Sequence, residues 1–245
     1  MKLKFKKNGP SSLEDLINLY NGREFKSPYR STVALLTLFK VDPTMKVIPN
    51  ELIDRSDTEC VFEYEVEVGR GRGYPSCTDL MIVSPDTCIA IEAKRTEPHY
   101  ETVAQWRGDS WNKREVLQGW LDMINSISPI TLSQHTVSQM PYQMIHRAAS
   151  ACLQRRKATR LVYMGFDLSR GKKEYYANNL ATLSKLTGSS LKISLVTLSI
   201  GKSSLQKDLE KQWDSGNRNL SIQIKRGIVN GSLMSFESVP EIRTF

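Results

Sequence analysis

Two acidic residues and a lysine flank a short turn in the first half of the chain. Residues 78–83 and 88–94 are two apolar runs separated by Ser-Pro-Asp-Thr, a composition typical of a turn. A two-residue loop and a four-residue loop give the same antiparallel register, which places Asp79 opposite Glu92. Directly opposed residues share one face of the sheet, with Cβ atoms about 4.5–5.5 Å apart. Two like charges at this spacing predict a divalent cation between them, and oxygen ligands suit Mg²⁺.

Lys94 follows Glu92 by two residues and therefore lies on the same face of the predicted strand. The opposite face of the hairpin is wholly apolar and should pack on a helix; it carries Leu80, Ile82, Ile89, Ile91 and Ala93. A lysine beside a bound cation can orient a water or stabilise charge on a phosphate. The catalytic residues predicted for phosphodiester hydrolysis are thus Asp79, Glu92 and Lys94. The alternative is a solvated hairpin end in which Lys94 pairs with an acid.

The preceding strand, residues 61–68, supplies a candidate third ligand. Phe62, Tyr64, Val66 and Val68 alternate with Glu63, Glu65 and Glu67, which predicts a half-buried strand with one acidic face. If this strand pairs with 78–83, its acidic face adjoins the site. Glu65 is the residue chosen as a metal ligand, and an exposed acidic face is the alternative.

Two further segments carry candidate nucleic-acid contacts. Glycines at 69, 71 and 73 permit a close approach of Arg70 and Arg72 to a phosphate backbone, although a plain mobile loop fits equally. On a helix predicted from Tyr142 to about Arg156, three polar residues lie along one flank: Gln143, His146 and Arg147. They could touch water or phosphate at the active-site face, or form a structural cluster.

These residues resemble the PD-(D/E)xK nuclease superfamily. The resemblance rests on Asp79, the apolar strand 89–91 and Glu92-Ala93-Lys94, although Thr78 stands where the motif name has proline. It implies a restriction-endonuclease-like mixed β-sheet flanked by helices. It also implies Mg²⁺ or Mn²⁺ as cofactor, with Asp79, Glu92 and the Ala93 backbone carbonyl as metal contacts.

A closer resemblance covers about residues 31–167 and is to an uncharacterised bacterial family of nuclease-like domains. It rests on Glu92-Ala93-Lys94, Glu97-Pro98, Trp106 and the string at 142–151, which reads YQMIHRAASA. We know of no substrate for that family, so this resemblance bears on fold and site rather than biology.

The remaining patterns predict an α/β fold in one domain, residues 1–245, with N-terminal helices and a helical insertion at about 100–128. Trp106, Trp111 and Trp120 are expected to pack within that insertion. Beyond the hairpin, predicted strands cover 160–166, 191–200 and 220–228. Other predicted helices cover 31–40, 173–186 and 204–213.

The composition limits the kinds of partner that the protein is expected to bind. The formal net charge of +8 suits a polyanionic partner, although it also serves solubility. No run of 18 apolar residues and no signal-like N-terminus is present, and the four cysteines form no CxxC pair. These features predict a cytoplasmic protein without a membrane span, and they leave a homodimer open.

The functional hypothesis is a Mg²⁺-dependent DNA endonuclease, with RNA not excluded as a substrate. The alternative is a catalytically weak or inactive nuclease-fold module that binds nucleic acid or protein.

Overall fold

A mixed β-sheet forms the centre of the molecule. The computed structural model describes residues 2–6, 8–48, 57–154, 156–237 and 239–245. The sheet has seven strands in the order β1-β2-β3-β4-β5-β6-β9. Their bounds are β1 Lys2–Phe5, β2 Glu59–Val66, β3 Ser76–Val83, β4 Thr87–Lys94, β5 Ala158–Phe166, β6 Leu191–Leu198 and β9 Glu241–Thr244. Strands β2, β3 and β4 are antiparallel, whereas β4, β5 and β6 run parallel.

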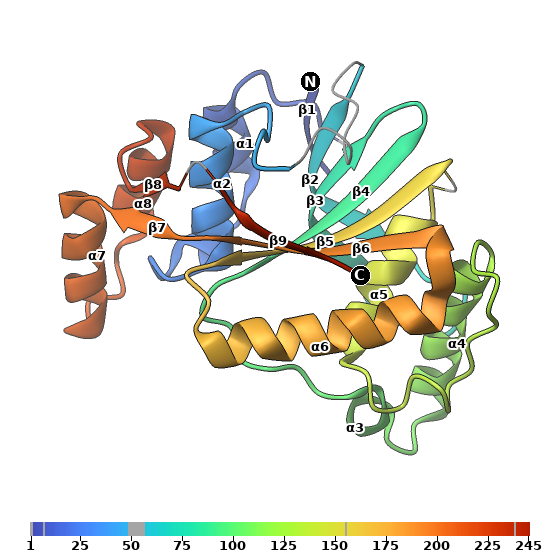
Figure 1. The fold of residues 1–245 in the computed structure, drawn as a ribbon. Helices are drawn as coiled ribbons and strands as arrows, with labels where there is room; N and C mark the ends of the chain where they lie inside the picture. The colour runs from blue at the N-terminus through green and yellow to red at the C-terminus, as the bar shows by residue number, and fades with distance from the viewer. Residues whose placement is uncertain (1, 7, 49–56, 155, 238) are drawn as a thin grey trace.

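Helices cover both faces of this sheet (Figure 1). One core contains side chains from α1 (Leu13–Leu19), α2 (Ser31–Val41), α7 (Ser204–Asp214) and α8 (Ser221–Val229). The other contains side chains from α4 (Trp111–Asn125), α5 (Tyr142–Cys152) and α6 (Arg170–Thr187), with the short α3 (Val103–Arg107) beside it. A two-stranded sheet, β7 (Ile200–Lys202) with β8 (Met234–Phe236), lies near α7 and α8. The predicted α/β fold with a mixed sheet flanked by helices is confirmed.

The hairpin packs as the sequence predicts. Leu80, Ile82 and Ile89 join the same core as the residues of α2, and this helix is buried from Ser31 to Phe39. The predicted helical insertion is α3 and α4. Trp120 is buried within it, but Trp111 is 71% exposed, so the expectation that Trp111 packs inside is wrong.

Residues 220–228 were predicted to be a strand, and this is wrong because they form most of helix α8. Leu220, Ile224 and Ile228 are fully buried and recur every fourth residue, which is helical spacing. Ile222, whose alternation with Ile224 suggested a strand, is 67% exposed. The period of four, not two, therefore governs this segment.

The strand β2 does not keep one apolar face. Phe62 packs in the core that contains α2, whereas Tyr64 and Val66 pack on the opposite core. Between them, Glu63 has a positive φ of 51°, in the left-handed region that non-glycine residues seldom adopt. This residue reverses the alternation. The prediction that Phe62, Tyr64 and Val66 share one face is therefore wrong.

Among the helices in the described ranges, none combines the length and the apolar character that crossing a membrane would need.

Candidate active site

The register of the β3–β4 hairpin is the one derived from the turn. Leu80 pairs with Ile91 and Ile82 with Ile89, and the same register extended by one residue would set Asp79 opposite Glu92. The ladder ends at Leu80, and beyond it the Asp79 side chain takes the place of a backbone partner. Its Oδ2 accepts a hydrogen bond from the Ala93 amide at 2.7 Å.

Asp79, Glu92, Ala93 and Lys94 line one cavity of about 270 Å³. We call this cavity the carboxylate pocket. Its wall is completed by residues from four other segments: Glu24, Arg30, Ser31, Thr32, Glu63, Cys77, Glu97, Tyr100, Gln143 and Arg147. The side chains predicted to act together therefore do open onto a common space, which lies where β3 and β4 separate.

Glu92 is buried and fully engaged. Lys94 Nζ donates to its Oε1 at 2.6 Å and Gln143 Nε2 donates to the same oxygen at 2.8 Å, while Arg147 Nε donates to Oε2. Burial raises the pKa of this carboxyl, but the nearby positive charges of Arg147 and Lys94 outweigh it and hold the pKa below its ordinary value. Glu92 is thus an anion at neutral pH.

Lys94 is only 3% exposed, yet it is charged. Besides Glu92 it donates to the Tyr100 hydroxyl at 3.2 Å. Burial disfavours the ammonium, but the charge of Glu92 outweighs this, and the pKa of Lys94 lies above its ordinary value. A lysine in this state offers a positive charge and hydrogen-bond donors; it does not act as a base.

Asp79 has the opposite electrostatics. Burial and the neighbouring Glu92 charge raise the pKa of its carboxyl well above the ordinary value, against the weaker influence of Lys94. The pKa values of these two carboxyls are thus shifted in opposite directions, because Lys94 and Arg147 stabilise mainly the charge of Glu92. A cation near Asp79 would relieve the repulsion.

Glu63 is the acid that the sequence analysis passed over. The ladder pairs on either side, Phe62 with Leu80 and Tyr64 with Thr78, place Glu63 opposite Asp79. Burial, then the charge of Glu24, raise the pKa of its carboxyl to about 7, with Glu92 adding to the effect. The β2–β3 register could have identified it, but the reversal at Glu63 was not visible in the alternation.

We predict that Glu63→Gln stabilises the protein above neutral pH. A carboxyl whose pKa rises from 4.5 to about 7 on folding favours the folded state below pH 4.5, and this advantage is lost as pH rises through 7. At pH 8 the glutamine variant should unfold at a higher urea concentration than the wild type. Its free energy of unfolding should be larger by about 1–2 kcal/mol. Urea titrations at pH 4 and pH 8 measure this, with Glu65→Gln as the control. Equal stabilisation at both pH values would contradict it.

Glu65, the predicted third metal ligand, lies elsewhere. Its carboxylate is paired with Lys6 Nζ at 2.6 Å, and it does not line the carboxylate pocket. The β2–β3 register sets Glu63, not Glu65, opposite Asp79, and the strand turns over after the left-handed Glu63, so Glu65 lies away from the pocket.

The two arginines of the glycine-rich loop also lie outside this pocket. Arg70 Nε pairs with Asp122 at 2.8 Å. The Arg72 amide donates to Asn112 Oδ1 at 2.7 Å, and Asn112 Nδ2 donates back to the Arg72 carbonyl at 2.8 Å. These contacts tie the loop to helix α4.

The three polar residues of helix α5 split between two roles. Gln143 and Arg147 bind Glu92 and line the carboxylate pocket. His146 does not line it; its Nδ1 lies 2.8 Å from Ser76 Oγ. The flank is therefore divided between the carboxylate pocket and a structural contact, and Arg147 joins the two because it donates to both Glu92 and Ser76.

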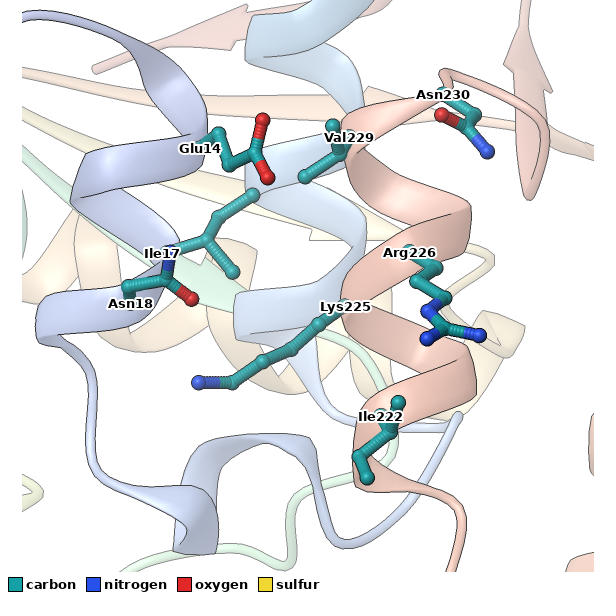
Figure 2. Close-up of a pocket in the computed structure, with 8 residues that line it drawn as sticks. All are labelled: Glu14, Ile17, Asn18, Ile222, Lys225, Arg226, Val229 and Asn230. Atoms are coloured by element: carbon teal, nitrogen blue, oxygen red, sulfur yellow. The ribbon is translucent and has the colours of Figure 1, made fainter.

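A larger cavity, about 670 Å³, lies between α1 and α8 (Figure 2). Lys225 extends from α8 toward α1, whereas Arg226 points away. Glu14 is the single acid among its lining residues, so it offers no pair of carboxylates. This cavity is larger than the carboxylate pocket, but it lacks the residues that the predicted chemistry needs.

The donor set of the carboxylate pocket limits what metal site it can form. Over the described ranges, no group of three or more His, Cys, Asp and Glu side chains has the geometry of an ion site. Two carboxylates with a backbone carbonyl remain compatible with a hard divalent cation, whose other ligands are water and substrate.

The fold and the pocket together define an α/β protein with a charged site at the end of a central hairpin. A family described as a domain of unknown function, DUF6946, matches residues 9–210, and the chain belongs to this family. No curated protein and no solved structure matches the chain.

Proposed function

We propose that this protein is a metal-dependent nuclease that hydrolyses phosphodiester bonds, with DNA as the favoured substrate and RNA as the alternative. The observation that carries the proposal is the shared carboxylate pocket of Asp79, Glu92 and Lys94 at the end of the β3–β4 hairpin. The resemblance of these residues to the PD-(D/E)xK superfamily supports the same activity. The mixed sheet with helices on both faces agrees with the fold that this resemblance implies.

The cation would be Mg²⁺ or Mn²⁺, held by Asp79, Glu92 and the Ala93 carbonyl. The Ala93 amide points toward Asp79. In a strand, the N–H and C=O of one residue face the same neighbouring strand. The Ala93 carbonyl thus faces Asp79 as well. Of the glutamates of strand β2, Glu63 rather than Glu65 lines the pocket. A bound divalent cation would polarise a phosphate oxygen and lower the pKa of a coordinated water.

The protein's own cations would hold the phosphate. Lys94 is fixed by Glu92 and Tyr100, so its ammonium points into the pocket at little entropic cost. Arg147 is held by Glu92 and Ser76. Both stay charged, and they would stabilise negative charge that develops on the phosphate during hydrolysis.

One observation favours a second function, in which the fold binds nucleic acid without cutting it. Both oxygens of Glu92 already accept hydrogen bonds from charged or amide donors. A carboxylate neutralised by two cations gains less from a metal than a bare one does. In that case the pocket binds phosphate through Lys94 and Arg147 alone.

The test compares cutting of four substrates: plasmid, linear duplex, single-stranded DNA and RNA. Each is incubated with Mg²⁺, with Mn²⁺ and with EDTA, using the wild-type chain and Lys94→Ala. Cutting that requires metal and falls by about 100-fold or more in Lys94→Ala supports the proposal. Cutting that persists in EDTA or in Lys94→Ala would overturn the site.

Binding without cutting of any substrate would favour the second function. Thermal unfolding with and without Mg²⁺ separates this from an inactive preparation, because a cation that binds the native state raises its stability. Glu65→Gln is the matched control, since Glu65 lies outside the carboxylate pocket.

A further inference from the structure

A second cavity, about 290 Å³, adjoins the carboxylate pocket. We call it the aromatic pocket. It is lined by Val68, Gly73, Tyr74, Pro75, Ser76, Cys77, Val116, Trp120, Tyr142, His146 and Arg147. Cys77 and Arg147 line both cavities, so the two cavities are neighbours that share a wall. Two neighbouring cavities fit a polymer with one unit in each cavity.

The aromatic pocket contains a hydrogen-bond donor whose orientation is fixed. Arg147 Nη1 donates to Ser76 Oγ at 2.6 Å, and Ser76 Oγ lies 2.8 Å from His146 Nδ1. Arginine can only donate, and its Nη1 also lies 3.5 Å from His146 Nδ1, so we assign Nδ1 as an acceptor, to which Ser76 donates its own proton. The imidazole proton therefore lies on Nε2.

Burial and the charge of Arg147 lower the pKa of His146 well below its ordinary value, so the ring is neutral. No hydrogen bond within the described ranges occupies Nε2. The side chain thus offers one directed N–H to a ligand that carries an acceptor. The carbonyl oxygens and ring nitrogens of nucleobases are acceptors of this kind.

Aromatic faces border the same space. Tyr142 and Trp120 are joined by a hydrogen bond from Trp120 Nε1 to the Tyr142 hydroxyl at 3.0 Å. Tyr142 is also stacked on Trp106 with centroids 3.6 Å apart, which fixes its ring. At the mouth, Tyr74 is 98% exposed. An exposed aromatic ring beside an aromatic cavity is available to stack on a ligand that enters the cavity.

Tyr74 is held near this mouth rather than on a free loop. Its loop is tied to α4 by the paired hydrogen bonds between Arg72 and Asn112. Gly71 lies so close to α4 that an added Cβ would sit 2.6 Å from a Val116 methyl carbon, and its φ is +71°. The loop thus has a defined course over the helix.

We propose that the aromatic pocket receives one unpaired nucleobase, next to the phosphate bound in the carboxylate pocket. The inference rests on the proposed nuclease function and deepens it: the substrate is single-stranded or locally unpaired nucleic acid. A base stacked and paired inside a duplex cannot enter a cavity of this size without leaving the helix. Tyr74 supplies stacking, Tyr142 and Trp120 border the base, and His146 Nε2 donates to it.

The experiment measures binding rather than cutting, so it does not depend on catalysis. Fluorescence polarisation in EDTA compares a short single-stranded DNA, the same sequence as RNA, and the matched duplex. The wild-type chain should bind the single strands at least about 10-fold more tightly than the duplex. Tyr74→Ala should weaken single-strand binding about 10-fold and leave duplex binding unchanged. Comparison of the DNA strand with the RNA strand shows which sugar the protein prefers.

Trp111→Ala is the control, because Trp111 is an exposed aromatic residue that does not line the aromatic pocket. A scan of single abasic sites along the strand adds a second readout. One abasic position should reproduce the loss seen in Tyr74→Ala, and the two losses should not add. His146→Phe, checked for folding by circular dichroism, should bind the intact strand more weakly than the wild type does. Its affinity for the strand with the critical abasic site should be unchanged.

Equal affinity for duplex and single strand, or a Tyr74→Ala variant that binds as wild type, would overturn the inference. Absence of binding to every nucleic acid would overturn it too. Single-strand binding without cutting under any metal condition would leave the inference standing and refute only the catalytic proposal.

Discussion

Asp79→Asn should stabilise the protein in metal-free buffer and should strongly reduce the metal-dependent cutting that we propose. The Asp79 carboxyl has a pKa well above its ordinary value because of burial and the charge of Glu92, so ionisation at neutral pH costs free energy. Asparagine keeps an oxygen that can accept from the Ala93 amide, and it removes the charge. The expected gain is about 1 kcal/mol in urea unfolding at pH 7.

The pH dependence of this gain has a definite sign. A carboxyl with a raised folded-state pKa stabilises the folded chain only while it is protonated. The advantage of Asp79→Asn should therefore be absent below pH 3.8, the ordinary value, and should grow as the pH rises toward neutrality. A variant less stable than wild type at pH 7 without metal would contradict the assignment.

A bound metal should reverse the order of stability. Wild-type protein should be stabilised by millimolar Mg²⁺ or Mn²⁺, and Asp79→Asn should not, because one charged ligand is lost. Cutting should fall by about 100-fold to 1,000-fold in the same variant. A variant that is more stable and inactive separates a catalytic role from a structural one. If cutting persists, Asp79 is not a metal ligand.

Glu92→Gln should destabilise the protein, although it also replaces a carboxylate with an amide as Asp79→Asn does. Glu92 is the counter-ion of two buried cations, Lys94 and Arg147. Removal of one partner of a buried ion pair leaves uncompensated charge and costs about 3–5 kcal/mol. Urea unfolding at pH 7 measures this. Cutting should also be lost, but here inactivity alone would not be informative.

The stability loss should shrink in acid. Glu92 has a lowered pKa, so it stabilises the folded state above pH 4.5, and this contribution is lost as pH falls through its folded-state pKa. A double variant, Glu92→Gln with Arg147→Met, should recover part of the stability because it removes one of the stranded cations. A Glu92→Gln variant as stable as wild type would refute the ion-pair network.

Much of the fold could be predicted because it depends on local patterns. The turn at 84–87 is short, so it leaves one register for the hairpin, and the observed pairs follow it. Strand β5 and helices α2, α6 and α7 lie within a few residues of the predicted ranges. Helices α6 and α7 begin at serine N-caps, Ser169 and Ser203, and α2 is a largely apolar run that ends before Pro43. Segment 220–228 failed because its apolar residues fit both periods over so short a length.

The carboxylate pair follows from sequence alone, since one turn determines which residues of two adjacent strands oppose each other. The state of each carboxylate does not. Arg147 lies 55 positions beyond Glu92, and only the packing of α5 on the sheet makes it the partner of Glu92 rather than Asp79. Likewise, the β2–β3 pairing sets Glu63 beside Asp79, and the left-handed backbone at Glu63 leaves Glu65 with Lys6. Contacts between distant segments depend on how whole faces pack, which no local spacing encodes.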